Sequence, residues 1–119
     1  MQQINWLSWN KETFEKAAKE KKPILLDIHG VWCHWCHEME SNTYSDPGVI
    51  NMINKYFVAI KVDTDKRPDV NKRYNQGGWP STVFLAPNGQ IITGTTYVPP
   101  NMLKDIMLKA IDTFKEIKT

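Results

Sequence analysis

The chain has 119 residues, of which 41% are hydrophobic and 24% are charged, and its formal net charge at pH 7 is +2. This length and composition are ordinary for one globular domain, residues 1–119, with its own hydrophobic core. The small net charge argues against a nucleic-acid partner, and no apolar run approaches the roughly 18 residues of a membrane span.

The first predicted element is a helix over residues 11–21. Asn10 is suited to cap its N-terminus, and Pro23 stops it, because a proline inside a helix removes a hydrogen bond and clashes with the preceding turn. The apolar residues share one inner face of this helix. That face is expected to carry Phe14, Ala17 and Ala18.

A buried strand is predicted next, over residues 24–29. Its sequence, ILLDIH, is an almost continuous apolar run with one aspartate, Asp27, which is typical of a strand covered on both faces of a sheet. The apolar neighbours indicate that Asp27 is buried as well. Gly30 ends the strand, and Cys33 stands where the following helix is expected to begin.

Two further helices and a strand are predicted in the middle of the chain. Asp46 and Pro47 suit a cap and a first helical residue, so a new helix, or a kinked continuation of the previous one, is predicted over residues 47–56. A strand is predicted over residues 57–63, followed by a short helix over residues 65–74. The inward side chains of the first of these helices are expected to be Val49, Ile50 and Ile53.

The last third of the chain predicts a β-hairpin and a terminal helix. Two β-rich segments within residues 81–95 flank a Pro-Asn-Gly turn, and the pair Pro99-Pro100 ends the sheet. The helix over residues 101–117 has one apolar stripe, which is expected to pack on the core. The stripe comprises Leu103, Ile106, Met107, Ala110, Ile111, Phe114 and Ile117.

The order of these elements indicates the fold class. A β-α-β unit followed by a β-β-α unit predicts an α/β protein with a central mixed β-sheet flanked by helices. Cys33 follows a buried strand, so it is expected at the carboxyl end of that strand. Open α/β sheets place their functional sites at this edge.

Residues 33–37, CHWCH, contain both cysteines of the chain. This spelling is compatible with a redox dithiol, with attachment of a c-type haem that uses His37 as an axial ligand, or with a zinc site completed by His34 or His29. Two cysteines this close together close too small a loop to stabilise a fold. A bond between them would therefore serve chemistry rather than structure.

The position of the cysteine pair favours the dithiol. A cysteine at a helix N-terminus faces free backbone N–H groups and the positive end of the helix dipole, which favour its thiolate. A second cysteine one turn later can then resolve a mixed disulfide. Structural zinc sites usually draw on two separated ligand pairs, whereas the sequence holds one pair.

The same residues resemble the thioredoxin family. A Trp-Cys-x-x-Cys segment at residues 32–36 follows a strand carrying Asp27, and a Gly-Trp-Pro segment at residues 78–80 precedes the predicted hairpin. The resemblance covers residues 10–117. The spellings WCHWCHEME, YSDPGVI, KVDTDKRPDV and GGWP are most similar to single-domain thioredoxin-like proteins and to the Cys-His-Trp-Cys-His domain that often begins spermatogenesis-associated thioredoxin-like proteins.

The resemblance implies a thioredoxin fold and thiol–disulfide oxidoreductase activity. Cys33 would attack a disulfide, Cys36 would resolve the mixed disulfide, and Asp27 would accept the proton of Cys36. In many thioredoxins a lysine of the next strand assists this aspartate. Its matching position is expected to be Ala59, with Lys61 one pleat further along the strand.

The resemblance also implies a substrate-binding surface around the dithiol. Trp35 is expected to face solvent and substrate, whereas Trp32 is expected to pack as well as to line this surface. A cis peptide bond is expected before Pro80, and His34 is expected to tune the attacking thiolate when it is protonated. The expected substrate-binding residues are Trp32, Trp35, Trp79 and Pro80.

No cofactor beyond the dithiol and no resident metal are expected. The expected partners are protein disulfide substrates and a redox partner, either a reductase or an oxidase, with no membrane or nucleic acid and with a monomeric chain. The N-terminus lacks the pattern of a secretory signal, which predicts a cytoplasmic location; a periplasmic or secreted location applies if a signal peptide was removed. A peptide-binding module of the same fold, without turnover, is the alternative function.

Overall fold

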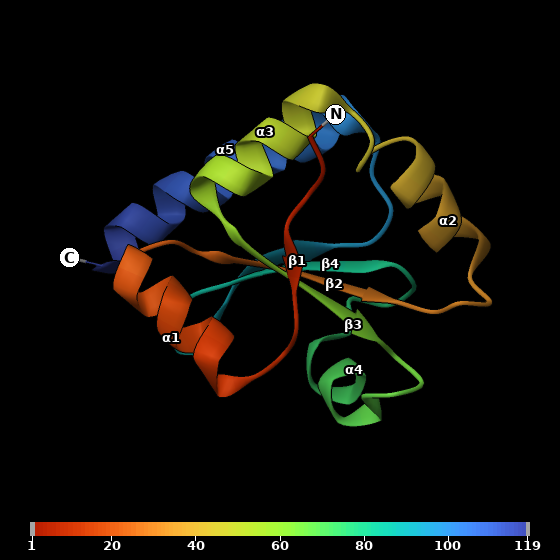
Figure 1. The fold of residues 1–119 in the computed structure, drawn as a ribbon, viewed down its shortest axis with the longest axis horizontal. Helices are drawn as coiled ribbons and strands as arrows, with labels where there is room; N and C mark the ends of the chain where they lie inside the picture. Colours follow the sequence, from red (N-terminus) through yellow and green to blue (C-terminus); the bar gives the residue numbers. More distant parts are fainter. Residues whose placement is uncertain (1, 119) are drawn as a thin grey trace.

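The computed structural model describes residues 2–118, which form a mixed β-sheet between two layers of helices (Figure 1). The sheet has five strands in the order β1-β3-β2-β4-β5. β1, β3 and β2 run parallel, while β4 is antiparallel to β2 and β5 is antiparallel to β4. The strands are β1 (Trp6–Leu7), β2 (Ile24–His29), β3 (Val58–Asp63), β4 (Ser81–Leu85) and β5 (Ile91–Thr95).

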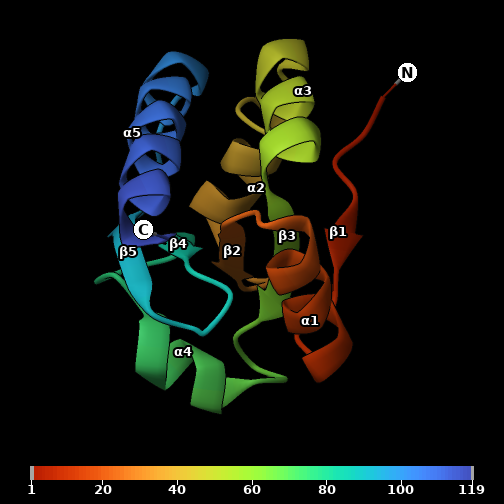
Figure 2. The ribbon, with the colours of Figure 1, turned by 90° about the vertical axis from the view of Figure 1, so that its left-hand side faces the viewer.

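The helices divide between the two faces of the sheet, as Figure 2 shows from the side. α2, α3 and α5 cover one face, and α1 and α4 cover the other (Figures 1 and 2). This arrangement confirms the predicted α/β architecture with helices on both sides of a mixed sheet. The helices are α1 (Lys11–Glu20), α2 (His34–Ser41), α3 (Pro47–Tyr56), α4 (Pro68–Tyr74) and α5 (Pro100–Lys118).

The helix starts follow from local capping. The Asn10 side chain accepts a hydrogen bond from the Thr13 backbone N–H, and Asp46 does the same for Val49, with Pro47 as the first residue of α3. These side chains satisfy backbone donors that the helix itself leaves unpaired. α3 is therefore a separate helix rather than a continuation of α2.

Three details of the predicted elements were wrong. β1 was not foreseen, because it consists of Trp6–Leu7 alone, pairs only with β3 and is too short to display an alternating pattern. α4 begins at Pro68 rather than at residue 65, since the residue before a proline is disfavoured in a helical conformation. Ala18 and Ile117 are exposed and do not belong to the inner faces of their helices.

Alternation along β2 decides which side chains face α2. Leu25 lies opposite both Ala59 of β3 and Phe84 of β4, and all three belong to the core beneath α2, α3 and α5. Successive strand residues point to opposite faces, so residues two apart share a face. Asp27 therefore points to the same side as Leu25, under α2, in the otherwise apolar interior.

Candidate active site

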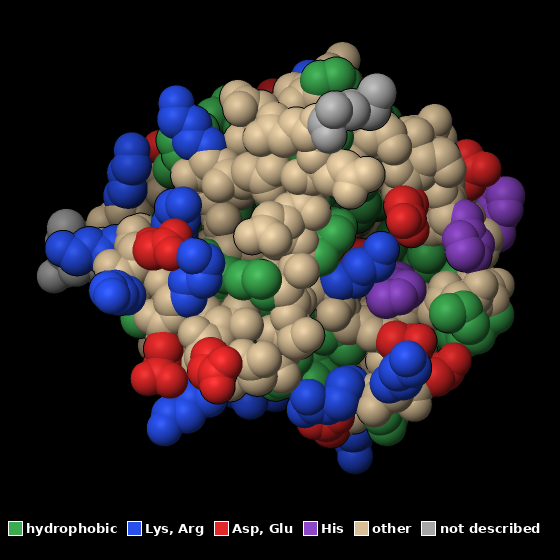
Figure 3. Space-filling view, in the orientation of Figure 1, with side chains coloured by type: hydrophobic (Ala, Val, Ile, Leu, Met, Phe, Trp, Pro, Cys, Tyr) green, Lys and Arg blue, Asp and Glu red, His purple; other side chains and the backbone are tan. Residues whose placement is uncertain are grey.

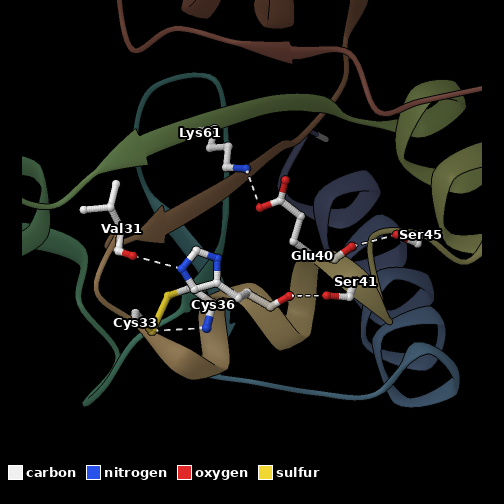
Figure 4. Close-up of polar contacts among 8 residues, drawn as sticks. Val31, Cys33, Cys36, Glu40, Ser41, Ser45 and Lys61 are labelled. Carbon is white, nitrogen blue, oxygen red and sulfur yellow. Dashed lines mark hydrogen bonds and ion pairs between the residues drawn. A yellow bond between two sulfur atoms is a disulfide. The ribbon is translucent and has the colours of Figure 1, made fainter.

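Both cysteines lie at the start of α2. Cys33 is the N-cap residue, and its Sγ accepts a hydrogen bond of 3.1 Å from the backbone N–H of Cys36. The two residues form a disulfide with a Cα–Cα distance of 5.2 Å, and both are buried (Figure 4). The predicted placement of Cys33 at the helix start is confirmed.

The loop before α2 is fastened to the helix itself. The backbone N–H of Cys33 donates to the Gly30 carbonyl at 3.1 Å, and a ring nitrogen of His37 lies 2.9 Å from the Val31 carbonyl oxygen. These two contacts join the loop between β2 and α2 to the first turn of α2. They hold the cysteine pair at the carboxyl edge of the sheet, as predicted.

Asp27 is buried beneath the cysteine-bearing helix, with a relative exposure of 3%. Its Oδ1 atom has no hydrogen-bond partner. Burial raises the pKa of this carboxyl from 3.8 to about 7; the positive charge of Lys61 opposes the rise and the negative charge of Glu40 adds to it. Asp27 can therefore exchange a proton near neutral pH, as a general acid or base requires.

The residue expected beside Asp27 was wrong by two positions: Lys61, not Ala59, is its neighbour on β3. The strand register sets Ala59 beside Leu25, whereas Lys61 lies directly opposite Asp27. The pairing of β2 with β3, which the sequence does not display, determines which side chains are neighbours. The Lys61 ammonium lies 3.4 Å from a carboxylate oxygen of Glu40 on α2 (Figure 4).

Three tryptophan side chains near the cysteine pair or before Pro80 are exposed at the surface. Trp32, Trp35 and Trp79 have relative exposures of 57%, 54% and 37%. The exposure of Trp35 was predicted, but that of Trp32 was not. The ring of Trp32 lies against the backbone of Gly30, where an added Cβ would approach a ring carbon to 2.6 Å, and its outer face remains open to solvent.

Side chains from other segments fix these rings. The indole N–H of Trp32 donates to Asp65 at 2.8 Å, and that of Trp79 donates to Asn71 at 3.0 Å. The Trp32 and Trp79 rings meet edge to face with centroids 5.4 Å apart. Polar anchors from α4 and from the loop before it thus orient the aromatic surface.

A groove of about 300 Å³ opens beside this aromatic surface. Tyr97 forms one wall, and its ring lies 5.2 Å from that of Trp35. Pro80 is buried next to the groove, and the Trp79–Pro80 peptide bond is cis. The lining residues are Trp35, Gly77, Gly78, Trp79, Thr96 and Tyr97.

Sequence reasoning did not identify Tyr97, Asn71 or Asp65 as residues of the site. Asp65 stands in the KVDTDKRPDV segment, but neither that segment nor those of Asn71 and Tyr97 indicate a contact with the tryptophan rings, which arises only through tertiary folding. Two lining residues of the groove, Trp35 and Trp79, were among the expected substrate-binding residues, whereas Thr96 and Tyr97 were not.

His34 points outward on the first turn of α2. Its Nε2 atom lies 4.0 Å from a carboxylate oxygen of Glu38, and its side chain is 72% exposed. Figure 3 shows histidine side chains at the end of the molecule where α2 lies. The expected influence of His34 on the Cys33 thiolate remains a prediction.

Within residues 2–118, no three side chains of His, Cys, Asp or Glu are arranged to hold a metal ion. None of the described helices is both long and apolar enough to cross a membrane.

The family is decided by a match along the whole chain. A family model described as "Thioredox_DsbH: Protein of unknown function, DUF255" matches residues 1–119. The chain belongs to this thioredoxin-like family. The predicted resemblance to thioredoxin-like proteins is therefore confirmed.

Relatives of this thioredoxin-like domain include much longer proteins. Spermatogenesis-associated protein 20 of Homo sapiens is 42% identical over 105 residues, which are 82% of this chain but only 13% of the human protein. Thioredoxin-1 of Drosophila melanogaster is 34% identical over 74 residues, or 62% of this chain and 66% of the fly protein. The chain thus spans a small part of the first of these relatives.

Solved structures place the Thioredox_DsbH domain in the thioredoxin fold. A structure named DsbH oxidoreductase superposes with a TM-score of 0.81 at 19% identity and covers 92% of this chain and 85% of its own. At this identity the likeness shows the fold alone. Together with the Cys33–Cys36 pair and the thioredoxin relative, it supports a redox role.

Proposed function

We propose that this chain is a thiol–disulfide oxidoreductase that uses Cys33 and Cys36 as its redox centre and acts on protein disulfides. The observation that carries the proposal is the position of the cysteine pair at the N-terminus of α2, above a buried carboxyl whose pKa is about 7. Helix N-termini stabilise thiolates, and a carboxyl of this pKa can take up a thiol proton at neutral pH.

In the reduced chain, the Cys33 thiolate attacks one sulfur of a client disulfide. A mixed disulfide forms, and the other client sulfur leaves as a thiolate. Cys36 then transfers its proton to Asp27 and attacks the Cys33 sulfur, which releases the second client thiolate. The client gains two electrons and the chain ends as the Cys33–Cys36 disulfide, which a dithiol or thiol reductant must reduce again.

The exposed aromatic side chains are evidence for a peptide substrate. Trp32, Trp35 and Trp79 with Pro80 are proposed to contact the client beside the attacked disulfide. Exposed aromatic rings contribute strongly to binding at protein interfaces. The same surface favours the rival function, a module that binds a peptide without turnover.

The direction of transfer depends on the reduction potential of the pair relative to its redox partner. Glutathione titration of the purified chain would measure that potential. A cytoplasmic location and a monomeric state remain predictions.

Reduction of insulin by dithiothreitol, with and without the chain, tests the proposal. We expect acceleration by the wild type and none by Cys33→Ser. Cys36→Ser should still attack and should accumulate mixed disulfides with clients, visible on non-reducing gels. A wild type that does not accelerate reduction but retains peptide binding would favour the rival module, and mixed disulfides with Cys33→Ser alone would overturn the assigned order of attack.

A further inference from the structure

A short loop carries Trp79 and part of the lining of the groove. It spans residues 75–80, between the end of α4 and the start of β4. Gly77 and Gly78 line the groove together with the Trp79 ring. Gly77 has a φ angle of 101°, which favours glycine, and beyond its chain neighbours no heavy atom of the described chain lies within 4 Å of where its Cβ would stand. Hydrogen bonds rather than packing must therefore hold this turn.

The side chain of Asn75 makes four hydrogen bonds at this loop. Its Oδ1 atom accepts the backbone N–H of Gly77 at 2.7 Å and that of Gly78 at 3.1 Å. Its Nδ2 atom donates to the Gly78 carbonyl at 3.3 Å and to Oδ1 of Asn71 at 2.8 Å. An asparagine side chain can imitate a backbone turn in this way, because its amide offers an acceptor and two donors. Both polar atoms of the Asn75 side chain are thus fully used.

Asn71 connects this loop to the Trp79 ring. It lies one turn before Asn75, and its Oδ1 atom accepts both the Asn75 amide and the indole N–H of Trp79, the latter at 3.0 Å. Among the residues that the structure describes, the Asn71 Nδ2 atom donates no hydrogen bond. Asn75 therefore fixes the loop backbone, and the oxygen of Asn71 fixes the ring relative to it.

Ser81 fastens the same loop from β4. Its Oγ atom accepts the Gln76 backbone N–H at 2.8 Å and donates to the Gly78 carbonyl at 2.6 Å, and the residue is fully buried. These contacts attach the backbone of the loop to the sheet, but they do not involve the Trp79 ring. The direction of that ring depends instead on the two asparagines and on its edge-to-face contact with Trp32.

We propose that Asn71 and Asn75 are positioning residues that hold the Trp79 ring and its loop in the conformation that binds a client peptide. Trp79 is 37% exposed, so without these contacts its ring would be free to adopt other rotamers. Binding would then have to order the ring and the loop, which weakens affinity. The two asparagines thus favour disulfides presented by a peptide over disulfides without one. This inference rests on the proposed function, in which clients contact this ring.

One isosteric substitution, made at each position in turn, tests the inference because the expected results differ. Asn75→Asp keeps an acceptor for the glycine N–H groups but replaces the double donor by an oxygen, which then faces the Asn71 and Gly78 oxygens. We expect its kcat/KM for insulin, divided by that for the peptide-free hydroxyethyl disulfide, to fall about tenfold. Asn88→Asp, in the exposed turn between β4 and β5, adds the same charge and is the matched control.

Asn71 offers a loss and its rescue at one position. Asn71→Leu removes the shared acceptor and should lower the same ratio about tenfold, whereas Asn71→Asp keeps that oxygen and should restore the ratio. Proton NMR of the Trp79 indole N–H should show faster exchange with water in Asn71→Leu than in Asn71→Asp. This measurement follows the ring directly and needs no turnover.

Three results would overturn the inference. The first is an equal loss for insulin and hydroxyethyl disulfide in Asn75→Asp and Asn71→Leu, since the effect would then lie at the dithiol. The second is an equal loss of the ratio in Asn71→Asp and Asn75→Asp, since the added charge alone would explain it. The third is an unchanged ratio in Asn75→Asp and Asn71→Leu. A wild type that reduces neither disulfide would refute the proposed function, and the inference with it, before any variant is compared.

Discussion

Asp27→Asn should stabilise the oxidised protein at high pH and leave its stability almost unchanged at low pH. Burial raises the pKa of Asp27 from 3.8 to about 7. This difference of about three pH units, at about 1.4 kcal/mol each, corresponds to a penalty of about 4 kcal/mol for holding the ionised carboxylate in the folded chain. Because packing relaxes around real charges, this value is an upper bound.

The sign follows from proton linkage. Below pH 4 the carboxyl is protonated in both the folded and the unfolded chain, so no penalty applies. Between pH 4 and pH 7 only the unfolded chain ionises, and the free energy of unfolding falls with rising pH; above pH 7 the loss is complete. Asparagine is neutral at every pH, so the free energy of unfolding of the variant does not fall between pH 4 and pH 7 through this residue.

Urea denaturation of the oxidised wild type and Asp27→Asn at pH 4 and pH 8 measures the effect. We expect almost equal stability at pH 4, and a variant more stable by about 2–4 kcal/mol at pH 8. Asp105→Asn, at an exposed carboxylate of α5, is the matched control. A gain of the same size at both pH values would refute the reasoning, since it would come from packing rather than from ionisation.

Three further substitutions test neighbouring features. Glu40→Gln should lower the pKa of Asp27, because the negative charge of Glu40 raises it, and carboxyl NMR would measure the change. Gly30→Ala places a methyl group 2.6 Å from the indole ring of Trp32. The ring must move, so tryptophan fluorescence should shift. Thr43→Val removes a buried hydroxyl that donates to the Val98 carbonyl at 2.6 Å, and urea denaturation should show a loss of about 1–3 kcal/mol.

Each of these substitutions has a matched control. Glu38→Gln removes a carboxylate from the same helix but is not a source of the Asp27 pKa change. Gly78→Ala adds a methyl group with an ordinary 3.6 Å contact. Ser45→Ala removes an exposed hydroxyl and should change stability by less than about 1 kcal/mol. Control effects as large as those of the test variants would contradict the roles assigned to Glu40, Gly30 and Thr43.

The predicted fold was right where signals were local. Asn10, Asp46 and Pro47 act at the helix starts to which they were assigned, because a cap depends only on residues within one turn. The continuous apolar run of β2 required burial on both sides, and burial of Asp27 followed from it. Cys33 at the start of α2 followed in turn from the strand and the glycine before it.

The predicted site was incomplete where contacts join distant segments. The prediction named Ala59 instead of Lys61 as the neighbour of Asp27, because strand register depends on pairing that the sequence does not display. Tyr97 stands in no recognised motif, and Tyr44 begins the YSDPGVI segment without any sign that it faces Asp27's side of the sheet. Their positions depend on how the end of α2 and the segment after β5 pack, which is decided by the whole core.

The cap of α2 links helix order to redox state. The sulfur that accepts the Cys36 N–H is also the proposed attacking atom. As a thiolate it is a strong acceptor, whereas in a mixed disulfide with a client it is a weak one. The first turn of α2 should therefore loosen when a client is attached and tighten when the dithiol is free. Amide hydrogen exchange at Cys36 would then report each stage of the reaction as a change in local stability.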